Sequence, residues 1–239
     1  MEREKVLITI AARGGSKGIK DKNIRLLCGL PLIAHTVRQA VTWGKADRII
    51  CSTDSPAIAK EAQKYGAEVP FMRPSHLAGD ECGKLDVLKH ALTVFENKTG
   101  ERFPIIIDLD VTAPIRSVAD IDGAYELFKS KKPNTVFSVT RARRNPYFNM
   151  VEVNQEGYAS VAKKTSYVYL RRQDAPVVYD MNASIYVYDR RYLFNENSHS
   201  AITEKSCVWR MDDLSAFDID HEVDFQFIEF LVMKGLVKL

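Results

Sequence analysis

The stretch VLITIAARGGSKGIKDKN, from Val6 to Asn23, joins a short apolar segment to a glycine-rich turn that carries several cations. Glycines allow backbone N–H groups to approach phosphate oxygens closely, and consecutive N–H groups in a tight turn form a small anion-binding concavity. Arg13, Lys17 and Lys22 add positive charge to this turn. An apolar strand that ends in such a turn is typical of a polyphosphate site.

The turn differs from the two common nucleotide-binding signatures. Lys17 lies between Ser16 and Gly18, so the turn has neither the G-x-x-x-x-G-K-[ST] of a P-loop nor the G-x-G-x-x-G of a dinucleotide-binding fold. A P-loop NTPase and a dinucleotide-binding protein are both disfavoured. The structural alternative is an ordinary turn with solvated cations, which the crowding of glycines and cations makes the weaker interpretation.

The composition is that of an ordinary globular protein. A chain of 239 residues with 46% hydrophobic and 27% charged residues fits one α/β domain with a substantial core. The formal charge is only +3 and the basic residues are scattered, so nucleic acid is not an expected partner.

The cysteines and the apolar segments bear on the compartment. Cys28, Cys51, Cys82 and Cys207 form no C-x-x-C pair, which disfavours a zinc knuckle or a dithiol site and favours a reducing cytoplasm. No stretch approaches the ~18 uninterrupted apolar residues of a membrane span, and no secretion signal is recognisable. We therefore expect a cytoplasmic protein with no membrane partner.

Strand-like and helix-like segments alternate along the first half of the chain. This alternation predicts a three-layer α/β/α domain with a mainly parallel sheet and right-handed crossovers. Ligands of such sheets lie beyond the carboxyl ends of the strands, so Arg13–Lys17, Thr53 with Asp54, Arg73 and Asp108–Thr112 should share one rim. The expected strands are 6–11, 48–52, 68–72, 104–109 and 135–140, and the expected helices are 31–43, 56–65, 84–96 and 118–129.

The texture changes between residues 141 and 182, where Tyr-, Val- and Arg-rich segments lack a helical period. We interpret these residues as a projecting antiparallel arm inserted within a single domain, 1–239. Exposed aromatic residues on such an arm commonly pack on a second subunit, so a homodimer is expected. A strand at 183–188 and an amphipathic helix at 223–235 complete the chain.

An acidic pair, Asp218 and Asp220, precedes the last helix in the segment FDID. In an extended segment both carboxylates project to one face, where they can bind Mg2+ together with substrate phosphates. Capping of the helix that begins near His221 is the alternative role for Asp220.

These motifs together resemble the cytidylyltransferases that activate nine-carbon ulosonic acids, such as the CMP-sialic acid synthetases. The resemblance spans nearly the whole chain, and several separated motifs in the correct order are more specific than any one of them. It implies a Rossmann-like nucleotidyltransferase fold with a dimerisation arm. The motifs are AARGGSKGIKDKN at 11–23, STDS at 52–55, YGAEVPFMRPSHLAGD at 65–80, DLDVTAPIR at 108–116, MNASIYV at 181–187 and FDID at 217–220.

The resemblance implies a reaction and a set of site residues. The anomeric hydroxyl of the acid would attack the α-phosphorus of CTP, giving the CMP-sugar and pyrophosphate, with Mg2+ held by Asp218 and Asp220. Arg13 and Lys17 would stabilise the transition state. By position, the CTP-binding residues would be Arg13, Gly14, Gly15, Ser16, Lys17, Lys22, Asn23, Arg73 and Asp80, and the acceptor would contact Arg172, Asn182 and Tyr186.

Three departures from the family pattern lie on the acceptor side. Asp110 replaces an expected glutamine, Asp180 replaces an arginine, and Glu81 to Lys84 replaces a serine-rich stretch. Carboxylates accept hydrogen bonds, which suits an acceptor with additional N–H donors such as an N-acylated diamino acid. The closest resemblance is to the legionaminic acid branch. Lys84 could supply charge for the acceptor's carboxylate, or it could be a solvated lysine at a helix start.

Other functions remain open at the level of sequence. N-acetylneuraminic acid and pseudaminic acid are rival acceptors, and an eight-carbon ulosonate or a sugar 1-phosphate is a more distant one. A nucleotide-binding domain without catalytic activity is a third possibility, which the presence of Arg13, Lys17, Asp218 and Asp220 disfavours.

Overall fold

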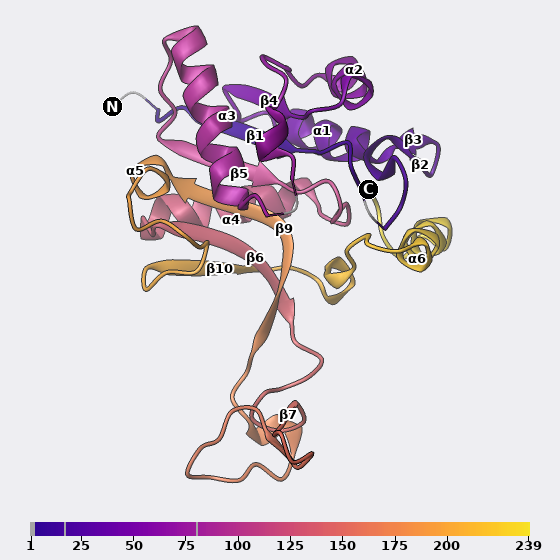
Figure 1. The fold of residues 1–239 in the computed structure, drawn as a ribbon, viewed down its shortest axis with the longest axis vertical. Coiled ribbons are helices and arrows are strands. Elements are labelled where there is room, and N and C mark those ends of the chain that lie inside the picture. The colour runs from indigo at the N-terminus through magenta and orange to yellow at the C-terminus, as the bar shows by residue number, and fades with distance from the viewer. Residues whose placement is uncertain (1–2, 17, 80) are drawn as a thin grey trace.

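The computed structural model describes residues 3–16, 18–79 and 81–239. A six-stranded sheet with the order β10-β6-β9-β5-β1-β4 forms its centre (Figure 1). Strand β9 runs antiparallel to both of its neighbours, whereas the other adjacent pairs are parallel. The strands are β1 (Val6–Ala11), β4 (Arg48–Ser52), β5 (Ile105–Leu109), β6 (Thr135–Arg141), β9 (Tyr179–Asp189) and β10 (Ser206–Arg210).

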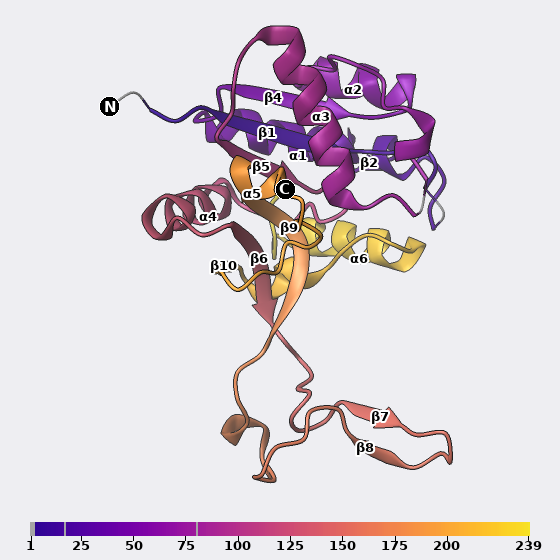
Figure 2. The same ribbon diagram turned by 60° about the vertical axis from the view of Figure 1, so that its left-hand side comes forward.

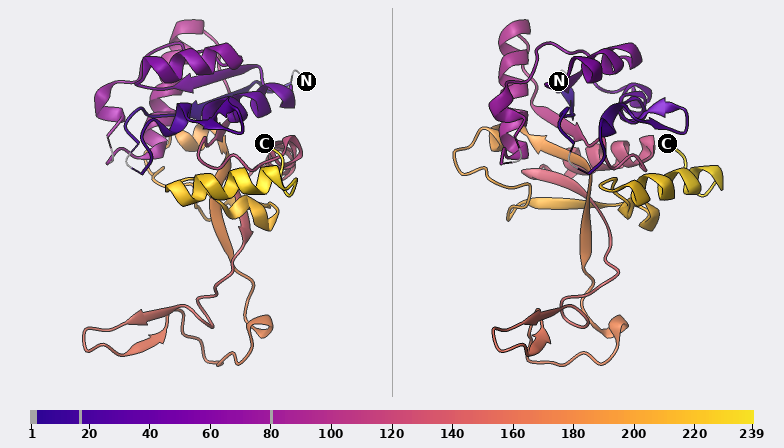
Figure 3. Two further views of the ribbon diagram at one scale, coloured as in Figure 1. Left: turned by 90° about the vertical axis from the view of Figure 1, so that its right-hand side faces the viewer. Right: turned by 45° about the vertical axis from the view of Figure 1, so that its right-hand side comes forward.

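Helices cover both faces of this sheet. Alternate residues of β1 belong to different apolar clusters: Val6, Ile8 and Ile10 pack with α1, α4 and α6, whereas Leu7 packs with α3. Helix α3 crosses one face in Figure 2, and α6 lies on the other side of the sheet in Figure 3. The predicted three-layer, mainly parallel architecture is confirmed. The helices are α1 (Leu32–Trp43), α2 (Pro56–Tyr65), α3 (Lys84–Thr99), α4 (Val118–Lys131), α5 (Arg190–Leu193) and α6 (Glu222–Met233).

Local sequence signals set several helix ends. Ser55 caps α2 by accepting a hydrogen bond from the Ile58 N–H, and Gly66 ends the helix at a φ of 112°. At the start of α6 the flanking residue is His221, and the Asp224 carboxylate accepts from the N–H groups of both Asp220 and His221. Asp220 therefore does not cap α6, and its carboxylate is available for another role.

Some elements differ from the sequence prediction. Residues 68–72 form no named strand and contribute one isolated bridge, between Glu68 and Ile50, because Pro70 has no N–H to continue the pairing. Strand β10 extends the sheet beyond β6 and was not predicted. A short hairpin of β2 (Leu26–Leu27) and β3 (Leu30–Pro31) precedes α1, and its turn uses Cys28 and Gly29 at positive φ.

Between β6 and β9 the chain leaves the core as an arm (Figures 1 and 2). The arm carries an antiparallel hairpin of β7 (Val151–Val153) and β8 (Ala159–Val161). Val168 and Leu170 on the arm are 75% and 79% exposed, which is unusual for large apolar side chains. The structure thus contains the projecting arm, and pairing through it stays a prediction.

Strand β9 carries an irregularity where it passes β6. The pairing shifts between Phe137 and Val139, and Ala183 opposite this shift adopts a φ of 54°. The Ser138 hydroxyl fills the gap by donating to Asn182 Oδ1 at 2.6 Å and accepting from the Ile185 N–H at 2.9 Å.

A search of the described helices finds none with the length and apolar character that crossing a bilayer requires.

Candidate active site

A cleft of about 440 Å3 lies at the carboxyl end of β1. Its walls come from the glycine-rich turn, the segment between α2 and α3, the start of α3, the segment after β5 and the acidic segment before α6. This is the rim that the strand order predicted. The predicted residues among its lining are Arg13, Ser16, Lys22, Asn23, Arg73, Lys84, Asp110 and Asp220.

The glycine-rich turn is held in place from two sides. The Gly14 N–H donates to Asp54 Oδ1 at 2.8 Å, and the Asn23 amide donates to the Arg13 carbonyl at 2.8 Å. A Cβ at Gly14 would lie 3.1 Å from the Cβ of Ser55, so glycine allows the turn to pack against the start of α2. Gly15 has open space around it. Lys17, predicted to bind the nucleotide, lies outside the described residues.

Arg73 reaches the cleft from the segment after α2. Its Nε donates to the Ser52 hydroxyl at 3.0 Å, its Nη2 donates to the Ser52 carbonyl, and its own N–H donates to the Thr53 carbonyl at 2.7 Å. Burial lowers the pKa of the guanidinium. Arg73 thus contributes a buried positive charge at the end of β4. Asp80, predicted beside it, lies outside the described residues.

Lys84 links two carboxylates of the β5 end. Its Nζ lies 2.9 Å from Asp108 Oδ2 and 3.0 Å from Asp110 Oδ2, and 4.4 Å from the ring centroid of Tyr186. Burial lowers the pKa of Lys84, but the two carboxylates outweigh it and hold the pKa well above its usual value. Lys84 is therefore a charged lysine with fixed partners, which excludes the alternative of a solvated lysine.

The other carboxylate oxygen of Asp110 accepts two hydrogen bonds from Thr112. Asp110 Oδ1 accepts from the N–H and the hydroxyl of Thr112, each at 3.0 Å. Burial raises the Asp110 pKa, but Lys84 and Thr112 outweigh it, so the net pKa is below its usual value. Both oxygens of this carboxylate have partners, and they fix the turn after β5.

The acidic pair lies in a segment that packs directly against the glycine-rich turn, where a Cβ at Gly18 would lie 2.0 Å from the Asp220 carbonyl oxygen. Ile219, between the two aspartates, is buried and donates its N–H to the Thr112 carbonyl at 2.9 Å. Asp218 has a buried oxygen, Oδ1, with no hydrogen-bond partner, and burial raises its pKa despite a bond from Thr112. Asp220 lines the cleft, and its side chain is mostly exposed.

This donor set fits a hard cation that also binds phosphate. Mg2+ prefers oxygen ligands and usually takes one or two carboxylates, with substrate phosphates and water completing its shell. The unpartnered oxygen of Asp218 and the accessible carboxylate of Asp220 supply such ligands. Among the described residues no group of three or more His, Cys, Asp or Glu side chains could hold a metal alone.

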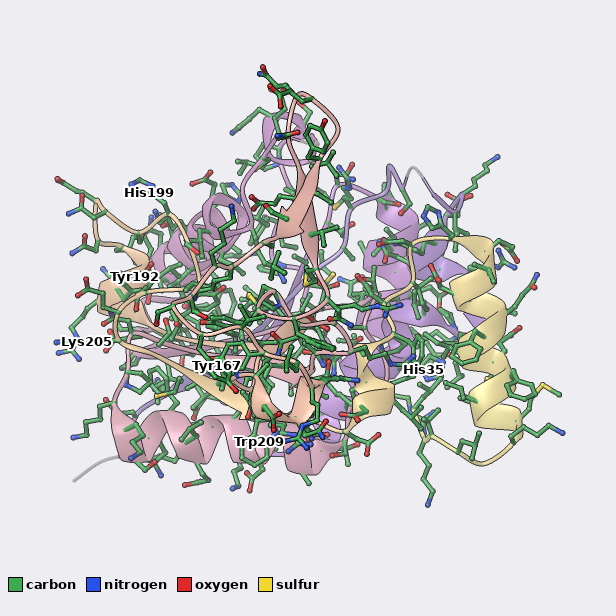
Figure 4. All side chains as sticks on the ribbon, turned by 90° about the horizontal axis from the view of Figure 1, so that it is seen from below. His35, Tyr167, Tyr192, His199, Lys205 and Trp209 are labelled. Carbon is green, nitrogen blue, oxygen red and sulfur yellow. The ribbon has the colours of Figure 1, made fainter. Side chains whose placement is uncertain are left out.

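A second cavity, of about 460 Å3, adjoins the first at Lys84. Tyr186, predicted to contact the acceptor, forms part of its wall together with Tyr188, and the two rings stack with centroids 6.0 Å apart. His199 lies on its rim, on the side of the molecule opposite α6 (Figure 4). Neither residue was predicted to belong to the site: Tyr188 directly follows the motif MNASIYV at 181–187 without being part of it, and His199 lies in no motif.

Three predicted acceptor residues lie outside both cavities. The amide of Asn182 is buried, donating to the Ser215 carbonyl at 3.0 Å and accepting from Ser138. Arg172 belongs to the arm, where it donates to the Ala142 carbonyl at 2.8 Å. Asp180 is exposed near the start of β9. Within one chain the structure does not bring these three to the cleft.

The fold and the site define a class before any relative is considered. A mainly parallel sheet, with a glycine-rich cationic turn after β1 and an acidic segment beside it, is the arrangement of an α/β nucleotidyltransferase.

Comparison with known proteins gives the family. The cytidylyltransferase family model matches residues 7–229, and the chain belongs to this family. The chain is 45% identical over 227 residues to the CMP-N,N'-diacetyllegionaminic acid synthase of Campylobacter jejuni, covering 95% of this chain and 94% of that protein. It is 44% identical, with the same coverage, to the post-translational flagellin modification protein B of Campylobacter coli.

A solved structure supports the fold independently. The chain superimposes with a TM-score of 0.69 on a CMP:2-keto-3-deoxy-manno-octonic acid synthetase complexed with CTP, at 17% identity, covering 97% of this chain and 99% of that one. The resemblance inferred from the motifs is confirmed, and the protein is a nucleotidyltransferase.

Proposed function

We propose that this protein transfers the cytidylyl group of CTP to a nine-carbon 2-keto sugar acid, best N,N'-diacetyllegionaminic acid, releasing pyrophosphate. The observation that carries the proposal is the pair of adjoining cavities that share Lys84. One cavity has the cationic turn that a triphosphate needs, with Asp220 of the acidic pair on its wall, and the other is large enough for a sugar acid. The name of the Campylobacter jejuni relative supports this choice of acceptor.

The nucleotide belongs in the first cavity. Backbone N–H groups of the turn, with Arg13, Ser16 and Lys17, would bind the triphosphate, and Arg73 with Asp80 would frame the nucleoside. Asp218 and Asp220 would hold Mg2+, which when bound neutralises phosphate charge and favours the departure of pyrophosphate. Most of the protein's contribution is positioning, as in other phosphoryl transfers.

The acceptor belongs in the second cavity, with its anomeric hydroxyl directed toward Lys84 and the α-phosphorus. The new bond joins that oxygen to the α-phosphorus as the hydroxyl proton leaves to solvent, and the bond from the α-phosphorus to the bridging oxygen of pyrophosphate breaks. Lys84 is the cation that both cavities have in their described lining, and it suits the carboxylate of the acceptor. Tyr186 would support the sugar ring through its apolar face.

The assembly and compartment follow as parts of the same proposal. A homodimer through the arm would cover the exposed side chains of Val168 and Leu170. It would also give Arg172 and Asp180 a partner's acceptor site to contact. The four cysteines are free thiols, which supports a cytoplasmic location.

The test is pyrophosphate release from CTP and Mg2+ with four acids compared side by side: N,N'-diacetyllegionaminic, N-acetylneuraminic, pseudaminic and 3-deoxy-manno-octulosonic acid. We expect the highest kcat/KM with the legionaminic substrate. A preference for another acid would change the acceptor that we propose, while the proposed reaction would stand. CTP binding with no release from any acid would support a nucleotide-binding protein without catalytic activity.

A further inference from the structure

Arg116, in the segment after β5, is buried and only 3% exposed. Its guanidinium donates five hydrogen bonds, one for each N–H group that it carries. The acceptors are Gln39 Oε1 at 2.8 Å, the Ser184 carbonyl at 2.6 Å, the Ser184 hydroxyl at 3.2 Å, the Thr36 hydroxyl at 2.8 Å and the Asp110 carbonyl at 2.8 Å. Because all five acceptors are uncharged oxygens, these bonds together offset the cost of burying the cation.

The five bonds of Arg116 join three elements of the fold. Thr36 and Gln39 belong to α1, Asp110 lies at the start of the turn after β5, and Ser184 belongs to β9. The Asp110 N–H also donates to the Ser184 carbonyl, at 3.2 Å, so the turn and the strand share this acceptor. The guanidinium therefore connects the turn after β5 to β9, and α1 supports it from behind.

The turn and the strand form walls of different cavities. Residues 110–112 line the first cavity, whereas Tyr186 and Tyr188 of β9 line the second. Ser184 precedes Tyr186 by two residues on the same strand. Within the part of the chain that the structure describes, Arg116 lines neither cavity. The spacing of the two cavities thus depends on a residue that has no wall position in either.

We propose that Arg116 is a positioning residue that holds the nucleotide side of the site at a fixed distance from the acceptor side. The proposal rests on the proposed function, because it assigns one substrate to each cavity. Without the five bonds each substrate would still bind in its own cavity, but the acceptor oxygen would no longer be aligned with the α-phosphorus. A misplacement of about 1 Å can cost about 100-fold in rate. We therefore expect kcat, rather than substrate binding, to depend on Arg116.

The first test separates alignment from binding. Arg116→Lys keeps the charge but replaces a planar five-donor group by three donors. We expect it to lower kcat for pyrophosphate release with the legionaminic substrate by about tenfold or more. The Kd for CTP with Mg2+, measured by calorimetry without acid, should change by less than about twofold. Unchanged kcat, or CTP binding weakened as much as kcat falls, would overturn the proposal.

The control for general destabilisation is Glu96→Gln. Glu96 is a second buried charge with several hydrogen bonds, which it accepts from Arg190 and from the Phe103 N–H. Among the described residues that line the two cavities, Glu96 is absent. Glu96→Gln should lower the free energy of unfolding and keep the native kcat. A loss of kcat in Glu96→Gln as large as that in Arg116→Lys would assign the effect to stability and contradict the proposal.

A milder variant keeps the test usable if Arg116→Lys does not fold. Thr36→Val removes one acceptor of the guanidinium and preserves the size of the side chain. We expect it to lower kcat by about threefold, in the same direction as Arg116→Lys. Thr140→Val is the matched control, because Thr140 is also buried and its hydroxyl has no hydrogen-bond partner among the described residues. Equal kcat in the two valine variants would contradict the proposal.

Amide hydrogen exchange tests the positioning contact without any turnover. The Asp110 N–H donates to β9, whereas the Ala12 N–H donates to the Ser52 carbonyl at 3.0 Å, at the end of β4. We expect Arg116→Lys to speed exchange at Asp110 relative to Ala12 by about tenfold or more, and Glu96→Gln to leave this ratio unchanged. An unchanged ratio in Arg116→Lys would overturn the proposal.

The outcomes distinguish this proposal from the proposed function. If the native protein releases no pyrophosphate with any of the four acids, the proposed function fails. A changed exchange ratio in Arg116→Lys would then still establish that Arg116 fixes the turn after β5 to β9. If the native protein turns over and neither kcat nor the exchange ratio responds to Arg116→Lys, the proposed function stands and the positioning role is wrong.

Discussion

Asp220 is the accessible member of the acidic pair. Its carboxylate lies 3.4 Å from the Lys22 ammonium and is otherwise mostly exposed to solvent. We predict that Asp220→Asn lowers kcat by about 100-fold or more, because the neutral amide is a poor ligand for a hard cation. The unfolding midpoint should change little, since the side chain is exposed. The control is Asp213→Asn, an exposed acidic residue outside the cleft lining. Native turnover in Asp220→Asn would exclude the metal role.

Lys84 compensates two carboxylates at once, and its loss would leave Asp108 and Asp110 facing each other. We predict that Lys84→Met raises KM for the acid acceptor by about tenfold or more, because like charges would then repel its carboxylate. The KM for CTP should change less. Pyrophosphate-release kinetics with Lys98→Met as the distant control would check this, and an equal effect on both substrates would contradict it.

Ala183 has a backbone conformation that favours glycine. A left-handed φ costs a non-glycine residue about 1–2 kcal/mol. Glycine avoids this cost, but it loses more conformational entropy on folding, which offsets part of the gain. We predict that Ala183→Gly stabilises the fold by about 0.5–1 kcal/mol, measured by urea unfolding. Ala78→Gly, at a φ of −103°, is the control and should not stabilise.

At the scale of elements, the arm presents apolar side chains that the core does not use. We predict that Leu170→Glu shifts a dimer toward monomer without unfolding the core, as measured by light scattering after size exclusion. Met233→Glu on α6 is the matched control, because Met233 is 83% exposed and Leu170 is 79% exposed. A dimer lost only in Met233→Glu would move the interface to α6.

Elements with strong local signals could be predicted from the sequence, and others could not. Helix α2 has its cap at Ser55 and its stop at Gly66, and both are local in sequence. Strand β10 is short, partly exposed and without a clear alternation of apolar and polar residues, and it forms where β6 offers an edge. Residues 68–72 look like a strand, but Pro70 prevents the pairing from continuing. Tertiary context decides such cases.

The same limit applies to the candidate site. The glycine-rich turn and the acidic pair could be predicted because each carries its own chemistry in a short motif, whereas Arg73 was placed by the strand order and by the family resemblance. Asn182 was predicted to contact the acceptor, yet its amide is satisfied inside the fold by Ser138 and Ser215. The contact of Lys22 with Ile219 depends on folding alone, and no spacing in the sequence indicates it.

At the scale of the whole molecule, Glu96 on α3 forms hydrogen bonds to the segment before β5 and to the start of α5. Its carboxylate is fully buried and bonds Arg190, the Phe103 N–H and Arg102. Burial raises its pKa, but these bonds outweigh burial and hold the pKa below its usual value. A lowered folded-state pKa means that the stabilisation is present above the unfolded pKa, about 4.3, and is lost as pH falls through the folded value.

We therefore predict that the free energy of unfolding falls on acidification below about pH 5, and that Glu96→Gln flattens this dependence. The variant should also be less stable at pH 7, by about 2 kcal/mol, since charged hydrogen bonds are replaced by neutral ones. Urea unfolding at several pH values checks both effects. Glu152→Gln, on the exposed arm, is the control and should keep the native pH profile.

Lys84 belongs to the walls of both cavities, so the two substrate sites share a part. Substitutions at Lys84 that broaden the range of acids should therefore also affect CTP, although less than they affect the acid. His199 and Ile202 line only the second cavity. Engineering of this chain toward new sugar acids should begin on that far wall, where a residue can be exchanged without touching the nucleotide.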